Sequence, residues 1–347
     1  MRIVKWIITS LALLVGRVAL YLLGVALTPG FPTPRQSLVS RKPEEGDGDA
    51  EVEIPRLDVT FDVDGTALKA LLYLPDNATA PAPCIVMAHG LGGTRKMGLG
   101  RYAVRFQAAG FAVLAFDYRF WGDSEGEPRG LIWIPHQLED YTAAIEYVRS
   151  RDEIDDARIA LWGTSFSGGH VVVTAAEDQQ IACAVAQCPG LDGQEGAAMA
   201  FKQRGLDLRI IPHAQRDLVR SWLGLSPHKI PVVGKPGDVA LMTTPEAMDA
   251  FQQMAPSDYV NEACARIAIR GDKYRPVKHA SDVWCPTLLQ ICEKDDLTPI
   301  GAVEETARIL GDLAEVKRHP IGHFDIYTGE HFEGSVADQT AFFEKHL

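Results

Sequence analysis

Largely apolar runs alternate with helical stretches along the middle of the chain. The apolar runs occupy residues 84–88, 111–116, 158–162 and 181–188, and each has the length of a buried strand. The intervening residues 102–109 and 136–150 are predicted to be helical, the second because apolar residues recur there at three- and four-residue intervals. Strands that alternate with helices in this way predict crossover connections and a mostly parallel sheet flanked by helices. The fold class is therefore α/β.

The same pattern resumes near the C-terminus after a long interruption. Residues 286–292 predict a strand, 300–313 a helix and 315–319 a last strand. The segment before them, about 190–284, has no strand pattern, although 208–223 and 245–253 carry helical signals. We therefore expect an insertion between the strands near 181–189 and 286–292.

A serine follows the third apolar run, within the sequence Gly163-Thr164-Ser165-Phe166-Ser167-Gly168-Gly169. A tight turn from a strand into a helix lifts such a hydroxyl clear of the sheet and leaves room only for small neighbours. The pattern therefore favours a catalytic nucleophile at Ser165. Ser167 departs from the usual motif, which has glycine at that position. The alternative interpretation is that Ser165 only caps the helix that follows.

A nucleophilic serine needs a base, and the base needs an acid that orients it. Asp295 follows the next-to-last predicted strand, and His323 lies beside a glycine on the loop after the last one. The order along the chain is therefore Ser165, Asp295, His323. Asp296, which adjoins Asp295, and Asp192, which follows the strand at 181–188, are alternative acids.

Four segments of the chain carry a resemblance to a known family. They are Met87-Ala88-His89-Gly90, then Phe116-Asp117-Tyr118-Arg119 with Trp121-Gly122-Asp123-Ser124, the segment from Gly163 to Gly169, and Gly322-His323-Phe324-Asp325-Ile326-Tyr327. From about residue 58 to its end the chain resembles the α/β-hydrolase superfamily. Within it, the motifs are similar to those of a branch of serine-aminopeptidase-like and dienelactone-hydrolase-like enzymes, which includes hydrolases and acyltransferases that tailor polyketides.

This resemblance assigns roles to particular residues. It implies that Ser165 is the nucleophile, Asp295 the acid and His323 the base. It also implies that the backbone N–H groups of Leu91 and Phe166 hold the oxyanion. A histidine two residues before Leu91, in the same glycine-rich loop, is expected to brace that loop by hydrogen bonds.

The resemblance also implies that the insertion at about 190–284 is a lid, within a hydrolase domain of residues 58–347. An apolar lid would shape a hydrophobic pocket for an acyl substrate. The side chains expected to line this pocket are Phe120, Trp121, Trp133, Met199, Phe201 and Trp222.

Together these features predict a serine hydrolase that cleaves an ester, thioester or amide of a hydrophobic small molecule through an acyl-enzyme. Acyl transfer by the same residues is the alternative within enzymes, and a membrane-tethered binding protein with this fold is the alternative outside them. A net charge of −12 without a Lys/Arg cluster argues against nucleic acid as a partner. The sequence has no P-loop, dinucleotide fingerprint or zinc-spaced Cys/His set, so neither a cofactor nor a metal is expected. It carries no signal for the oligomeric state.

The first 28 residues differ from the rest of the chain. Residues 6–27 are nearly all apolar, follow Arg2 and Lys5, and are interrupted only by Arg17. Insertion of this segment into a bilayer comes out favourable by about 2 kcal/mol, which predicts a membrane anchor. The alternative is a signal peptide cleaved after Ala26, which would leave a secreted protein. Residues 29–57, rich in proline and then in charge, are predicted to be an extended linker.

The cysteines and most of the histidines need no catalytic role. Four of the six cysteines lie within apolar strand runs, so they are expected to be buried and unpaired. Cys183 and Cys188, an odd number of positions apart, are expected to face opposite sides of one strand. His213 and His228, within the insertion, are expected to be surface or packing residues.

Overall fold

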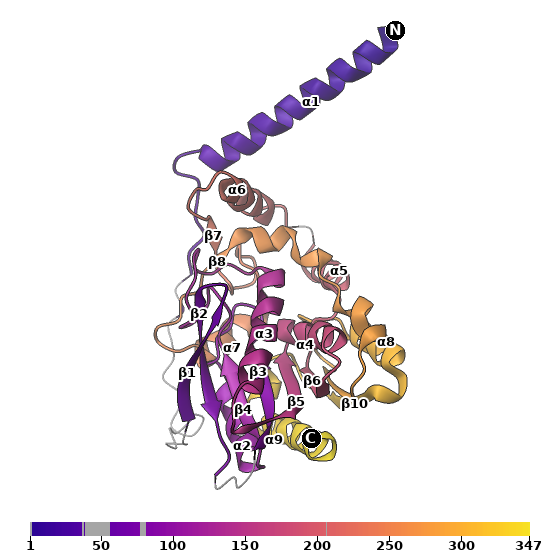
Figure 1. Cartoon of the computed structure of the whole chain (residues 1–347). Coiled ribbons are helices and arrows are strands. Elements are labelled where there is room, and N and C mark those ends of the chain that lie inside the picture. Colours follow the sequence, from indigo (N-terminus) through magenta and orange to yellow (C-terminus); the bar gives the residue numbers. More distant parts are fainter. Residues whose placement is uncertain (1, 37, 39–55, 77–80, 206) are drawn as a thin grey trace.

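The computed structural model describes residues 2–36, 38, 56–76, 81–205 and 207–347. Most of the linker expected at 29–57 therefore lies outside the described residues. The chain begins with a long helix, α1 (Arg2–Leu27), which projects away from the rest of the protein (Figure 1). Only the C-terminal end of α1 packs against the body, where it contacts α6 (Ile210–Trp222).

One sheet of eight strands, in the order β1-β2-β4-β3-β5-β6-β9-β10, forms the centre of the body. Strands β1 and β2 run antiparallel to each other, β2 runs antiparallel to β4, and all the other neighbours are parallel. The parallel part confirms the expected α/β class. The strands are β1 (Arg56–Val63), β2 (Thr66–Tyr73), β3 (Ala82–Ala88), β4 (Ala112–Phe116), β5 (Ile154–Thr164), β6 (Ile181–Gln187), β9 (Thr287–Cys292) and β10 (Ala314–His319).

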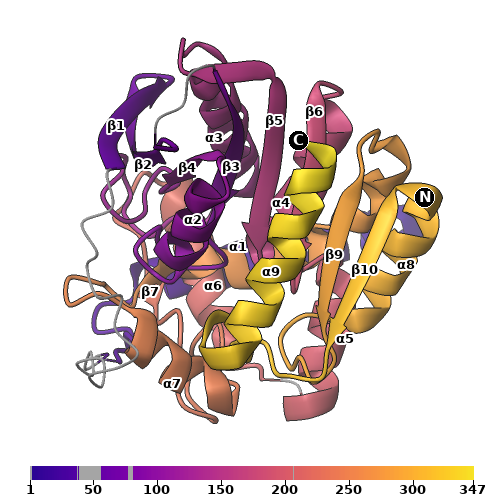
Figure 2. The ribbon, with the colours of Figure 1, turned by 90° about the horizontal axis from the view of Figure 1, so that it is seen from below.

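Helices cover both faces of this sheet (Figure 2). One face packs against α3 (Ile134–Arg149), α4 (Phe166–Glu177) and α8 (Ile300–Leu310), and the other against α2 (Leu99–Ala108) and α9 (Gly329–His346). In β3, Val86 belongs to the first core and its neighbours Ile85 and Met87 to the second. This alternation is the period of a strand, and it explains why both faces of the central strands are apolar.

The insertion expected at about 190–284 lies between β6 and β9, as the sequence predicted. It contains both expected helices, α6 and α7 (Pro245–Met254), and three elements that the pattern did not reveal. Those are α5 (Gly193–Arg204) and the two-residue strands β7 (Lys229–Ile230) and β8 (Ala263–Cys264). Short 3-10 helices complete the chain: Ala265–Ile269, Gly271–Lys273, Pro276–Asp282, Gly311–Leu313 and Asp325–Tyr327.

All six cysteines are free and buried, which confirms the expectation for the four that lie within strand runs. The expectation that Cys183 and Cys188 face opposite sides of the sheet is wrong, since both pack in the core beneath α2 and α9. The physical reason is that β6 ends at Gln187. Cys188 then takes a positive φ of 35°, which breaks the alternation of the strand.

Candidate active site

The turn between β5 and α4 holds Ser165 in a conformation that is rare for a side chain other than glycine. Its φ of 56° and ψ of −120° lie outside the ordinary regions, and its N–H donates to the carbonyl of Gln187 at 2.9 Å. A Cβ at Gly163 would lie 2.4 Å from the carbonyl oxygen of Ser167, and a Cβ at Gly168 would lie 2.6 Å from the ring of Pro189. The small residues of the motif are therefore demanded by backbone that passes too close for a side chain.

Ser167, which stands where the usual motif has glycine, has a specific partner. Its hydroxyl lies 3.0 Å from the hydroxyl of Tyr118, and both residues are almost fully buried. Tyr118 follows β4, so this hydrogen bond ties the start of α4 to the loop after the neighbouring strand. Sequence reasoning missed Tyr118. The available signal was its position just after a predicted strand, two residues beyond Phe116.

The structure brings Ser165, Asp295 and His323 into one hydrogen-bonded row. Nε2 of His323 lies 3.0 Å from Oγ of Ser165, and Nδ1 lies 2.6 Å from Oδ2 of Asp295. The side chains of His323 and Asp295 are each only 2 % exposed. The three residues come from the ends of different elements, more than a hundred positions apart in two of the three pairs. Such a row can pass a proton from the serine to the imidazole.

Asp295 is held as a carboxylate by the groups around it. Its oxygens accept the N–H groups of Leu297 and Thr298 and the hydroxyl of Thr298, at 2.8, 2.7 and 2.6 Å. Burial raises the pKa of this carboxyl, but the charge of His323 and these donors outweigh burial, and the pKa of Asp295 is lowered. The carboxylate can therefore orient the imidazole and stabilise its charged form.

The two alternative acids lie elsewhere. Asp192 caps the N-terminus of α5 by accepting the N–H groups of Gln194 and Glu195, and its other oxygen pairs with Arg275 at 2.7 Å. Asp296 does not hydrogen-bond to His323, and burial together with the charge of Asp295 raises the pKa of Asp296. The geometry therefore singles out Asp295 as the neighbour of the histidine.

The electrostatics of His323 follow from its position. Burial disfavours the charged imidazolium, but the adjoining Asp295 carboxylate outweighs burial, and the pKa of His323 is raised above its ordinary value of 6.5. The neutral ring is needed to accept a proton, so the fraction competent for that step increases as pH rises through this pKa.

The glycine-rich loop after β3 lies against the serine. A Cβ at Gly90 would come within 3.0 Å of the Ser165 Cβ. His89 braces this loop as expected, because its Nδ1 donates to the carbonyl of Gly90 at 2.9 Å. Burial lowers the pKa of His89, so its ring is neutral. Tyr259 of the insertion also holds the loop, because its hydroxyl donates to the carbonyl of Gly92 at 2.6 Å.

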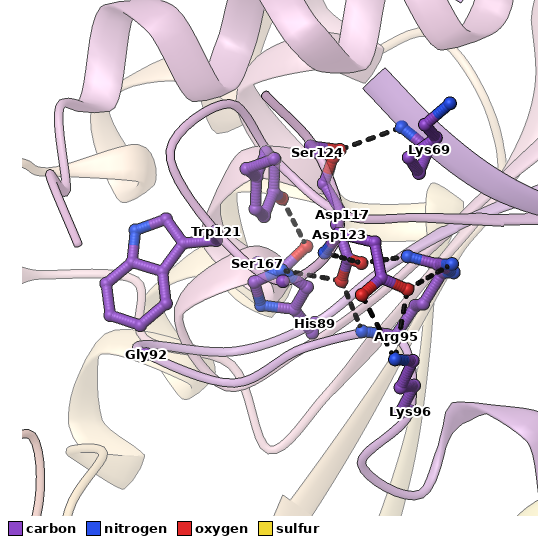
Figure 3. A network of polar contacts seen from close by, with 12 residues as sticks. Lys69, His89, Gly92, Arg95, Lys96, Asp117, Trp121, Asp123, Ser124 and Ser167 are labelled. Carbon is purple, nitrogen blue, oxygen red and sulfur yellow. Dashed lines mark hydrogen bonds and ion pairs between the residues drawn. The ribbon is translucent and has the colours of Figure 1, made fainter. Parts of the chain in front are cut away.

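A buried carboxylate fixes the next residues of the same loop (Figure 3). Asp117, at the end of β4, is 0 % exposed and accepts the backbone N–H of Arg95 at 2.7 Å and that of Asp123 at 3.1 Å. It also pairs with the Arg95 guanidinium, whose other arm reaches Asp123 at 2.7 Å. Gly122 must be glycine here, since a Cβ would lie 2.3 Å from Asp117. The sequence placed Asp117 within a motif but did not reveal this role.

Of the six side chains expected to line the pocket, Met199 lines a cavity that includes Ser165, and the other five lie elsewhere. Phe201 is 59 % exposed and lines a neighbouring cavity of about 1110 Å³, whereas Trp222 is 65 % exposed. Trp133 instead packs against Arg270, whose guanidinium carbon lies 4.6 Å from the centre of the Trp133 ring. Phe120 and Trp121 line a separate cavity of about 340 Å³ that does not include Ser165, whereas Met199 lines one that does. Among the described residues no cluster of three or more His, Cys, Asp or Glu side chains is arranged to hold a metal ion.

The fold and the row of three side chains define a member of the α/β hydrolases. The family profile of X-Pro dipeptidyl-peptidases (S15 family) matches residues 64–208. The chain is 42 % identical over 291 residues to a protein named Quorum-quenching protein AidA from Acinetobacter baumannii, covering 83 % of this chain and 94 % of that protein. The chain therefore belongs to the α/β-hydrolase superfamily, and the protein is an enzyme.

Two further likenesses extend over most of the chain. A polyketide transferase from Aspergillus fumigatus is 26 % identical over 300 residues, which cover 84 % of this chain and 99 % of that one. The crystal structure of the α/β hydrolase GrgF from Penicillium sp. sh18 superposes with a TM-score of 0.73 at 24 % identity, covering 84 % of this chain and 99 % of that one. The structural likeness establishes the fold independently of sequence.

Proposed function

We propose that the protein is a serine hydrolase that forms an acyl-enzyme on Ser165. His323 takes the proton from the Ser165 hydroxyl as its oxygen attacks the carbonyl carbon of an ester, thioester or amide. The N–H groups of Leu91 and Phe166 hold the oxyanion of the tetrahedral intermediate. His323 then gives the proton to the leaving group as the carbon–heteroatom bond breaks. Water attacks the acyl-enzyme by the same sequence and releases the acid.

The observation that carries this proposal is the hydrogen-bonded row of Ser165, His323 and Asp295 at a strained turn between a strand and a helix. Phe166 is the first residue of α4, so its N–H is one of the unpaired donors at a helix N-terminus. Each such donor is worth about 3 kcal/mol of transition-state stabilisation. The proposed catalytic domain is residues 58–347, with the insertion at about 190–284 acting as a lid.

The test is labelling of the full chain, purified in detergent, with a fluorophosphonate probe. We expect wild type to be labelled and Ser165→Ala and His323→Ala not to be labelled. Thr174→Ala is a matched control on α4, because it removes a buried hydroxyl for which the described residues contain no partner. Wild-type protein that is folded by circular dichroism but takes no label would refute the proposed function.

Acyl transfer is a second candidate, favoured by the likeness to a protein named as a polyketide transferase. In that reaction an alcohol or amine replaces water as the acceptor that releases the acyl group from Ser165. Adding a primary alcohol during ester turnover and measuring the ratio of new ester to free acid separates the two. If the ratio of new ester to free acid rises only in proportion to the mole fraction of alcohol in the solvent, the protein has no dedicated acceptor site.

We further propose that α1 anchors the protein in a membrane. The segment Trp6–Leu27 is long and apolar enough to cross a bilayer, with a mean hydropathy of 2.1, although a signal sequence passes the same test. The C-terminal end of α1 favours retention of the helix. Its carbonyls at Val25 and Ala26 accept bonds from Arg216 and Arg220 of α6, at 2.5 and 3.0 Å, and Ala26 is fully buried. Cleavage after Ala26 would break these contacts.

The anchor is tested by fractionation and by mass. We expect the protein to remain with membranes after an alkaline carbonate wash and to retain its N-terminal residues by intact-mass spectrometry. A soluble species that begins at Leu27 would establish the signal-peptide alternative. A substitution of Leu14→Lys near the middle of α1 should release the uncleaved protein, since a central lysine costs about 3 kcal/mol.

A further inference from the structure

Ser165 opens on two cavities of very different size. The smaller measures about 40 Å³ and is walled by His323, Phe324, Phe251 and Met254. The larger measures about 280 Å³ and runs beneath α5, with walls that include Phe166, Met199 and Ala200. Both cavities share Ser165, Leu91 and Met242 in their linings, so they meet at the nucleophile.

The larger cavity continues away from the serine. A third cavity of about 1110 Å³ has Ala197, Ala200, Leu241 and Ala268 in common with it. The two cavities also share the carboxylates Asp272 and Asp296, so four small or apolar side chains and two acidic ones line the junction of the two spaces. The shared lining makes one path between α5 and the start of α6. The small cavity shares none of its lining residues with this third one.

The chemistry of acyl transfer decides which part of a substrate enters each space. The leaving group receives its proton from Nε2 of the histidine, so it must lie on the histidine's side of the scissile bond. The cavity walled by His323 is the small one, and the His323 side chain is only 2 % exposed. The acyl chain, on the other side of the carbonyl carbon, then extends past Phe166 into the large cavity.

The volumes of the cavities indicate which class of substrate fits the site. A space of about 40 Å³ holds about three water molecules, which is the size of a methoxy or ethoxy group. The path through the larger cavities accommodates a long or bulky acyl group, and its walls are mainly apolar side chains. Resting on the proposed function, we infer that this enzyme selects substrates with a large apolar acyl group and a small leaving group. The same division would place a small acceptor, in an acyl transfer, on the histidine side.

A pair of isomeric esters tests this division directly. Ethyl decanoate and decyl acetate have the same atoms, but the first carries its long chain on the acyl side and the second on the leaving-group side. We expect the full chain in detergent to hydrolyse ethyl decanoate with kcat/KM about tenfold or more above that for decyl acetate. Acid release in a pH-stat measures both. Equal or reversed values in an enzyme that does hydrolyse esters would overturn the assignment and leave the proposed function standing.

Substitutions in each cavity sharpen the test. Ala200→Phe fills the junction of the two larger cavities and should lower the ratio of ethyl decanoate to ethyl acetate hydrolysis about tenfold. Lys202→Phe introduces the same ring at an exposed position of α5 and should leave that ratio unchanged. Met254→Ala enlarges the small cavity and should raise turnover of decyl acetate relative to ethyl decanoate.

The outcomes distinguish the two proposals. If Ala200→Phe and Lys202→Phe act alike, the path beneath α5 does not carry the acyl chain. If neither ester is hydrolysed while a fluorophosphonate still labels Ser165, the inferred substrate class is wrong. If the probe fails as well on folded protein, the proposed function itself fails, and the substrate class falls with it.

Discussion

The hydrogen bond between Tyr118 and Ser167 predicts that the losses of unfolding free energy from two substitutions are not additive. The two hydroxyls lie 3.0 Å apart, Tyr118 is 1 % and Ser167 0 % exposed, and among the described residues neither hydroxyl has another partner. Tyr118→Phe leaves the Ser167 hydroxyl buried and unpaired, and Ser167→Ala does the same to Tyr118. Each single change should therefore cost about 1–3 kcal/mol of unfolding free energy. The double variant removes both polar groups and should cost less than the two singles together.

The assay is chemical unfolding of the full chain in detergent, followed by tryptophan fluorescence. We expect a coupling energy of about 1 kcal/mol or more from the four proteins of the cycle. Tyr147→Phe serves as the control, since the Tyr147 hydroxyl bonds to the partly exposed Arg151 at 2.9 Å and its loss should cost little. Additive losses would refute the reasoning, because they would mean that neither hydroxyl depends on the other. Fluorophosphonate labelling rates of the same variants report whether the bond also aligns Ser165.

Three other predictions concern the site and its supports. Asp295→Asn should lower kcat by about 10⁴-fold and move the acid limb of the pH–rate profile to lower pH, since the charge that raises the pKa of His323 is gone. Asp192→Asn should leave the acid limb in place, and a shift of that limb in the Asp192 variant would reassign the acid. Asp117→Asn should cost about 3 kcal/mol in chemical unfolding because a buried ion pair is broken, whereas Asp258→Asn, at an exposed pair, should cost under about 1 kcal/mol; equal losses would contradict the bracing role. All six cysteines should resist a thiol reagent until the protein unfolds, as they are free and buried, and rapid reaction of the native protein would contradict that burial.

The sequence predicted the elements that belong to regular periodic patterns. The strands from β3 to β6 and the helices α2 and α3 were found within a few residues, because each buries a face whose period is visible in the chain. The antiparallel strands β1 and β2 were not singled out, since an edge hairpin exposed on one side has a weaker apolar signal. The helix α5 was missed for a similar reason, because few of its side chains are buried.

The insertion shows where local pattern stops being informative. Its packing depends on contacts between segments far apart in the chain, such as the buried pair of His213 and His228, whose ring nitrogens lie 2.8 Å apart. Phe31, before the sheet begins, packs edge-on to both rings. No periodic pattern in the sequence predicts such a cluster, and both histidines were expected only as surface or packing residues.

By itself the sequence determined the fold class, the order of the candidate residues along the chain and the turn that exposes Ser165, because these depend on local periodicity and on small residues at fixed spacing. Only the tertiary structure decided that Asp295, rather than Asp192 or Asp296, lies beside His323. It also decided that Ser167 is bonded to Tyr118 and that unequal cavities meet at the serine. The physical reason is that side-chain proximity and cavity volume depend on how distant segments pack, and a one-dimensional pattern does not specify that packing.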